Sequence, residues 1–267
     1  MRAFPLYINQ MLHACQLAHE HLNRHIHKRD VLKHTINTTL LVAELKLGHK
    51  TICASFLKHV PECSPIALDD IHAEFGKEVH DIIVNIQKLK NISTPPRQKD
   101  LKTVRHMFLA VSKELRAIIL KMCSLIDWLK NLDDLPPEEQ KKRAVEAMEI
   151  YAPIADMLGM WGLKWQLEDY AFKILVPQEY QKIEKRFHID EKKNRDKYIE
   201  RTRRILLKEA KKAGIDCEIS GRLKHFYSIY QKMQNKRKAF NEIYDVFALT
   251  VVVDTIDDCY RMLGIIH

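Results

Sequence analysis

Apolar residues recur every three or four positions through most of the chain, as they do on the buried face of an amphipathic helix. The most apolar of these segments, residues 115–132, is expected to form the buried centre of a helical domain. Proline pairs at 95–96 and 136–137 interrupt the pattern, as do Gly159 and Gly162. The spacing predicts helices at residues 7–29, 31–47, 50–60, 77–89, 100–110, 115–132, 136–151 and 163–174.

The periodicity changes after a long basic helix predicted at residues 194–213, which Gly214 ends. Further elements are then expected in the order strand, helix, strand, helix, at residues 215–220, 223–235, 246–253 and 255–263. The second strand is rich in β-branched residues, so we expect it to be buried on both faces. We therefore predict a mostly α domain, connecting helices and the first part of an α/β domain, at residues 1–150, 151–193 and 194–267.

Composition narrows the class of protein. Hydrophobic residues make up 46% and charged residues 30% of the chain, and only seven glycines occur, which is typical of a helical globular protein. The six cysteines form no C-x-x-C pair, which predicts reduced thiols in a cytoplasmic protein. No apolar run reaches the roughly 18 residues of a membrane span, and the N-terminus lacks a signal-peptide pattern. The net charge of +9 favours an anionic partner, such as nucleotide phosphates or RNA.

One cluster of residues near the C-terminal end suggests a phosphate site. Lys224, Ser228 and Lys232 are spaced by four, so a helix would place them on one face. Arg222 precedes them, where we expect the helix amides to favour anions as well. Asp245 begins the following strand and could hold Mg²⁺. A solvated basic helix face followed by a capping acid explains the same spacing, and the spacing alone does not separate the two interpretations.

Residues 221–232, GRLKHFYSIYQK, together with Tyr244-Asp245 resemble the start of the synthetase domain of RelA/SpoT homologues. Residues 151–169 and 258–267 are also similar to that family, so the resemblance covers nearly the whole chain. It implies a nucleotidyltransferase-like domain that transfers pyrophosphate from ATP to the 3′-hydroxyl of GDP or GTP in the stringent response. It implies that the ATP phosphates are contacted by Arg222, Lys224, Ser228 and Lys232. It also implies that Asp245 is the catalytic residue that binds Mg²⁺.

This sequence departs from the family pattern at two positions and ends early. Leu223 stands where the family usually has proline, and Thr250 where it has arginine, so one ATP-phosphate contact is in question. The guanine-stacking tyrosine and the catalytic glutamate of the family lie beyond residue 267. We therefore expect a chain truncated within the synthetase domain, and inactive as this piece alone.

Residues 1–150 resemble the family's helical HD-type hydrolase domain, in which Mn²⁺ is held by a histidine, a His-Asp pair and a later aspartate, with a Glu-Asp pair nearby. In this sequence those positions fall, in order, on His34, Lys58-His59, Ser124 and Glu62-Cys63. The resemblance therefore places a cation where a metal ligand should be. Mn²⁺ binding and hydrolase activity are not expected, and the domain is predicted to be regulatory.

His34 and Glu62 are the two residues that remain in place in this remnant of a hydrolase site. His59 and Asp127 are displaced by one and three positions, which on a helix turns them by about 100° and 300°. Two other functions remain open. A non-catalytic regulatory pseudoenzyme could bind nucleotide without turnover, and RNA or the ribosome could bind through the basic residues 194–212 or through parts beyond this chain.

Overall fold

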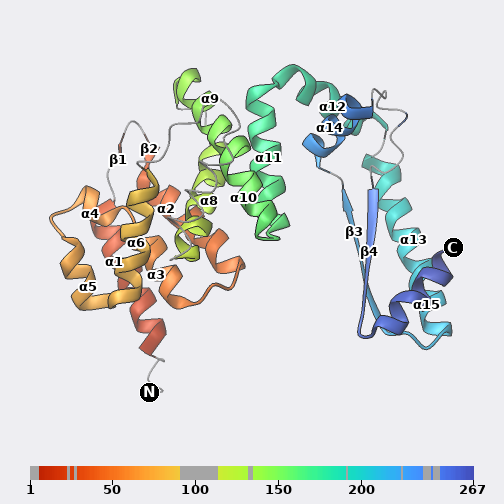
Figure 1. Ribbon diagram of the computed structural model, residues 1–267, viewed down its shortest axis with the longest axis horizontal. Helices are drawn as coiled ribbons and strands as arrows, with labels where there is room; N and C mark the ends of the chain where they lie inside the picture. The colour runs from red at the N-terminus through yellow and green to blue at the C-terminus, as the bar shows by residue number, and fades with distance from the viewer. Residues whose placement is uncertain are drawn as a thin grey trace. The chain divides into compact units, whose positions relative to one another are not determined.

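The computed structural model describes two compact units, Met1–Leu175 and Val176–His267 (Figure 1). The residues it describes are 6–22, 25–26, 29–90, 114–131, 135–190, 192–223, 225–236, 242 and 247–267. The described part of the first unit is helical apart from a hairpin of two two-residue strands, and the second unit joins helices to a two-stranded sheet. This order confirms the predicted class, a mostly α domain followed by the first part of an α/β domain.

The first unit follows the predicted helical pattern closely. The predicted helix at residues 7–29 ends earlier than expected, because a short antiparallel hairpin follows Leu22. The predicted helix at residues 100–110 lies outside the described residues. The elements are α1 (Leu6–Leu22), β1 (His25–Ile26), β2 (Arg29–Asp30), α2 (Val31–Glu44), α3 (His49–Leu57), α4 (Val60–Cys63), α5 (Leu68–Phe75), α6 (Lys77–Lys90), α8 (Leu115–Lys130), α9 (Pro137–Glu146), the π-helix η1 (Ala147–Tyr151), α10 (Ala152–Met157) and α11 (Trp161–Leu175).

Helix α8 forms the centre of this unit, as its sequence predicts. Ten of its 16 residues are buried. It packs against α2, α6 and α11, which surround it in the ribbon (Figure 1). A helix that is apolar around most of its circumference must be covered on several sides, and these neighbours supply that cover.

The expected connecting segment, residues 151–193, is not one separate piece. Tyr151, Ile154, Leu163 and Leu167 belong to the core of the first unit, where η1, α10 and α11 pack. Proline cannot donate a backbone hydrogen bond, and the wider turn of η1 ends two residues before Pro153. Contacts divide the chain after Leu175, because the apolar faces of these helices close over α8 and α9.

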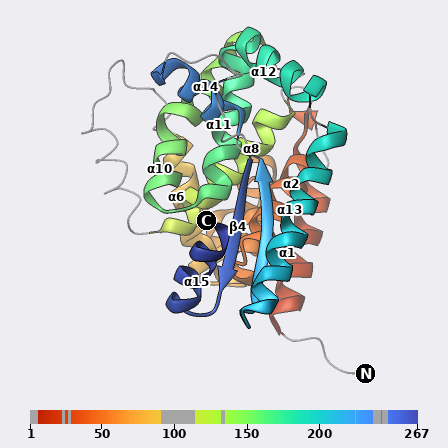
Figure 2. The same ribbon diagram turned by 90° about the vertical axis from the view of Figure 1, so that its right-hand side faces the viewer.

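The second unit is built on a short antiparallel sheet. Strand β3 pairs with strand β4 from Cys217↔Val253 to Leu223↔Phe247. Helix α13 packs against β3, and α15 packs against β4 and α13, as Figure 2 shows. A small core of Ala210, Ile215 and Met262 lies among these elements. Their bounds are α12 (Pro177–Asp190), α13 (Lys192–Lys212), β3 (Cys217–Leu223), α14 (Phe226–Lys236), β4 (Phe247–Val253) and α15 (Ile256–Ile266).

Two expectations for this unit are wrong. Strand β4 is not buried on both faces, since Val252 is 56% exposed while Val251 and Val253 are partly buried against the small core. The predicted helix at 223–235 begins only at Phe226, because Gly221, Arg222 and Leu223 are held in β3 by pairing with β4. Cross-strand pairing thus places Leu223 in the strand, although the predicted helix included it.

Three further observations concern the chain as a whole. No helix among the described residues is long and apolar enough to cross a membrane. All six cysteines fall within the described residues, and none of them forms a disulfide. Burial raises the pKa of the Cys123 thiol to about 12, so this thiol is protonated at neutral pH and is a poor nucleophile.

A close contact at Gly221 gives a test of the second unit. A Cβ atom at this position would lie 2.5 Å from Cγ2 of Ile199 on α13 and 3.4 Å from Cδ2 of Leu249 on β4. We expect Gly221→Val to lower the free energy of unfolding by about 1–3 kcal/mol, because β3 must move away from α13. Denaturant unfolding followed by circular dichroism measures this change.

Gly264 on α15 provides the matched control, since a Cβ atom there has no neighbour within 4 Å. Gly264→Ala should raise stability by roughly 0.5–1 kcal/mol, because alanine is the better helix former. If Gly221→Val unfolds at the same denaturant concentration as the wild type, the described packing of β3 on α13 is wrong.

Candidate functional site

A buried polar cluster joins α2 to α8 in the first unit. Nδ1 of His34 lies 2.6 Å from Oδ2 of Asp127, and both side chains are more than nine-tenths buried. The other carboxylate oxygen of Asp127 accepts hydrogen bonds from the side-chain amides of Asn37 at 3.0 Å and Asn131 at 3.1 Å. Three donors therefore converge on one carboxylate, which fixes the imidazole ring in place.

The second ring nitrogen of His34 is also engaged. Its Nε2 lies 2.9 Å from Oγ of Ser124, one turn before Asp127 on α8. With Asp127 accepting the proton on Nδ1, Nε2 is the acceptor and the Ser124 hydroxyl is the donor. Both nitrogens of the imidazole are thus used within the protein.

The electrostatic surroundings keep this imidazole neutral. Burial first, and then the positive charge of Lys58, lower the pKa of His34 to about 3, against the raising effect of Asp127. Lys58 is only 2% exposed. A cation held in the protein interior next to the ring makes a second positive charge on the ring unfavourable.

Lys58 belongs to the turn between α3 and α4, and His59 is the next residue of the same turn. The His59 ring lies near the His34 ring, with centroids 5.7 Å apart. Glu62 pairs with His59, Oε2 to Nδ1 at 3.5 Å, and its side chain is 40% exposed. Glu62 thus lies beside the cluster, with its carboxylate directed at His59.

These donors do not fit a divalent metal. A metal site of this kind needs several carboxylate or imidazole ligands on one point in space. Nowhere in the described part of the chain do three or more His, Cys, Asp or Glu side chains group to hold a metal ion. Nε2 of His34 faces a hydroxyl, and the nearby ammonium of Lys58 repels a metal cation.

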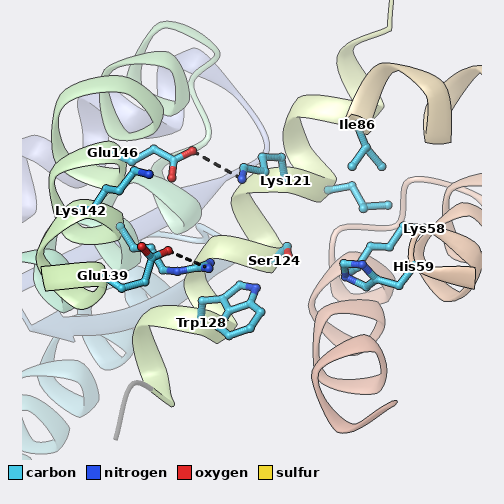
Figure 3. A pocket seen from close by; sticks show the side chains of 11 residues that line it. Lys58, His59, Ile86, Lys121, Ser124, Trp128, Glu139, Lys142 and Glu146 are labelled. Carbon is cyan, nitrogen blue, oxygen red and sulfur yellow. Dashed lines mark ion pairs between the residues drawn. The ribbon is translucent and has the colours of Figure 1, made fainter. Parts of the chain in front are cut away.

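A cavity of about 280 Å³ opens beside this cluster (Figure 3). Two ion pairs lie on its wall, Lys121 to Glu146 at 3.5 Å and Arg143 to Glu139 at 3.2 Å. The Arg143 guanidinium also lies over the Trp128 ring, 4.3 Å from its centroid. The described lining consists of Lys58, His59, Ile86, Leu120, Lys121, Ser124, Trp128, Glu139, Lys142, Arg143 and Glu146.

The structure adds Asp127 to the residues expected around His34. Sequence comparison by position assigned the ligand role to Ser124 and treated Asp127 as displaced by three residues. Both side chains contact His34, one at each ring nitrogen. Three helical residues turn a side chain by about 300°, which is only about 60° from its starting direction. That small net rotation is the signal in the sequence that identifies Asp127.

In the second unit, α14 carries two of the predicted phosphate-binding residues. Ser228 and Lys232 lie four residues apart, and both are partly buried. Another side of this helix packs on its neighbours, since Ile229 is fully buried and Phe226 meets the Tyr180 ring of α12 edge-on at 5.3 Å. The helix therefore brings Ser228 and Lys232 to one face, as their spacing requires.

The remaining predicted residues of the phosphate site are described only in part. The backbone of Arg222 lies in β3, paired with Ala248, and not at the start of a helix as expected. Lys224 and Asp245 lie outside the described residues, so their predicted roles stay predictions. Thr250, which takes the place of an arginine in the resemblance, is exposed on β4 opposite Ser220.

Comparison with known families matches both parts of the chain. The HD domain family matches residues 14–161, which include the His34 cluster and the cavity lining. A region found in RelA / SpoT proteins matches residues 221–267, which begin at Gly221 in β3. The two matches together cover most of the described elements of the two units.

Similar proteins carry two different names. A probable guanosine-3′,5′-bis(diphosphate) 3′-pyrophosphohydrolase of Synechocystis is 35% identical over 88% of this chain and 31% of its own length. A GTP pyrophosphokinase of Escherichia coli is 36% identical over 85% of this chain and 31% of its own length. A solved metazoan SpoT orthologue aligns with 64% of this chain and 97% of its own, at TM-score 0.46 and 17% identity. The chain spans about a third of the length of the first two relatives.

Proposed function

Because this chain belongs to the RelA/SpoT family and joins an HD domain to the RelA/SpoT region, we propose that its protein acts in (p)ppGpp metabolism as a synthetase with an inactive hydrolase site. The proposed reaction transfers the β,γ-pyrophosphate of ATP to the 3′-hydroxyl of GDP or GTP and releases AMP. Relatives are named for hydrolysis and for synthesis, so the choice between the two rests on this chain's own residues.

The observation that carries the choice is the donor set around His34. Its Nε2 faces the Ser124 hydroxyl, and Lys58 places a positive charge nearby. A hydrolase that depends on a divalent metal needs carboxylates to bind the ion and activate its water. A hydroxyl and an ammonium supply neither, which supports loss of hydrolysis.

Five residues are proposed for the ATP side of the synthetase site. The hydroxyl of Ser228 and the ammonium of Lys232, on one face of α14, would contact the phosphates. Arg222 would add a guanidinium that can bind phosphate oxygens in pairs, and Lys224 a further charge. Asp245 would hold Mg²⁺ as the catalytic carboxylate. Positioning and charge neutralisation are the main contributions of such residues to phosphoryl transfer.

The direct experiment incubates the full-length protein with γ-labelled ATP, GDP and Mg²⁺, and separates the products by chromatography. We expect labelled ppGpp, and a loss of roughly 10²-fold or more in rate for Lys232→Met, because a phosphate charge loses its partner. Lys211→Met, which removes an exposed lysine on α13, is the matched control and should keep full activity.

Two results would count against the proposal. Absence of product under all conditions would favour a nucleotide-binding pseudoenzyme without turnover. Release of pyrophosphate from ppGpp with Mn²⁺ would show that the hydrolase site is active. The same full-length preparation serves both assays, so a folded but inactive protein is distinguished from a hydrolase.

A further inference from the structure

The cavity beside the His34 cluster has an uneven charge. Four cationic side chains line it, against the two carboxylates of Glu139 and Glu146. The four cations come from the α3–α4 turn, α8 and α9, so elements far apart in the sequence converge on the cavity (Figure 3). The cations are Lys58, Lys121, Lys142 and Arg143. A cavity lined in this way attracts an anion, because the low-dielectric walls strengthen the field inside it.

The carboxylates hold two of these cations in place. Glu146 lies 3.5 Å from the ammonium of Lys121, and Glu139 lies 3.2 Å from the guanidinium of Arg143. The Trp128 ring stacks under the same guanidinium and limits its movement. An arginine fixed in this way keeps donors that can bind phosphate-type oxygens at a small entropic cost.

Lys58 places a fixed positive charge in the interior, beside the His34 ring. Its ammonium is almost fully buried, and it lies close enough to His34 to act on that ring. Unlike a metal ion, it cannot activate a water molecule by coordination. The site therefore keeps a fixed positive charge and lacks the means of hydrolysis.

We propose that this cavity is a metal-independent binding site for a compact polyanion of the inorganic pyrophosphate type. Its volume of about 280 Å³ falls just below the roughly 300–1,000 Å³ of pockets that bury a whole drug-sized ligand, which favours a compact anion over an entire nucleotide. The same chemistry occurs at the end of a nucleoside diphosphate. The site does not depend on synthetase activity, and it gives the first unit a means to sense phosphate compounds.

The experiment titrates inorganic pyrophosphate into the chain by calorimetry, with EDTA present to remove metals. We expect saturable binding at one site, weakened at least 10-fold by Lys58→Met. Since Lys58 is buried, Lys142→Met is the second variant, because it removes an exposed lining lysine and leaves the core untouched. It should weaken binding several-fold. Lys141→Met, its exposed neighbour outside the described lining, should leave the affinity unchanged.

A parallel titration with GDP distinguishes the two sources of the anion. Binding of GDP that is lost in Lys58→Met identifies a nucleotide end as a ligand of this cavity, and its absence leaves the free anion as the ligand. The proposal is overturned if pyrophosphate shows no saturable binding, if it binds only when Mn²⁺ replaces EDTA, or if Lys141→Met weakens binding as much as Lys142→Met.

Discussion

Asp127→Ala is expected to lower the free energy of unfolding of the first unit by roughly 3 kcal/mol. Asp127 is 5% exposed, and its carboxylate accepts hydrogen bonds from His34, Asn37 and Asn131. Truncation leaves these donors without their acceptor in a site that water reaches poorly. Each orphaned buried group costs about 1–3 kcal/mol, and partial relaxation of the amides reduces the total. Chemical denaturation monitored by circular dichroism measures the loss.

Two companion variants show whether the effect comes from the hydrogen bonds. Asp127→Asn keeps the size and one acceptor oxygen but directs an amide at other donors, so it should fall between the wild type and Asp127→Ala. Asp156→Ala breaks an ion pair with Lys164, at 3.0 Å, in which the aspartate side chain is 44% exposed, and should cost less than about 1 kcal/mol. Equal losses for Asp127→Ala and Asp156→Ala would show that the buried cluster does not stabilise the fold.

The second large effect is a dependence of stability on pH that originates at His34. Its pKa is about 3 in the folded protein, against 6.5 for an ordinary histidine, because of burial first and then the charge of Lys58. Between these values the unfolded chain binds a proton that the folded chain does not. The contribution of His34 to the free energy of unfolding is therefore complete above pH 6.5, and it decreases as the pH drops toward 3. Each pH unit in that window costs about 1.4 kcal/mol.

Unfolding free energies measured at pH 7 and pH 5 test this expectation. The wild type should lose about 2 kcal/mol from His34 over that interval, and His34→Gln should lack this part of the loss. The groups that face the ring are Lys58, His59 and Asp127, and they are unchanged in the variant. His19→Gln, at an exposed position of α1, is the control and should follow the wild type. Parallel pH profiles for His34→Gln and the wild type would contradict the buried neutral imidazole.

The positions of most helices could be predicted from the sequence because they depend on local spacing. The apolar residues of α8 occupy nearly its whole circumference, and burial of that helix follows directly. The lysine at position 58 is also visible in the sequence, where a metal ligand is expected by resemblance. Boundaries that depend on a distant partner were predicted less well. Leu223 was predicted to begin a helix, but pairing with Phe247 holds it in a strand.

The order of residues along the chain determined its helical pattern, the spacing of Ser228 and Lys232, and the presence of Lys58 and Ser124 at positions where the family resemblance predicts metal ligands. Only the tertiary structure decided that Asp127 meets His34, since 93 residues separate them and the contact exists because α2 packs on α8. The cationic cavity likewise requires the α3–α4 turn, α8 and α9 to come together. Periodicity is a property of neighbouring residues, whereas hydrogen bonds and cavities between elements depend on how those elements pack.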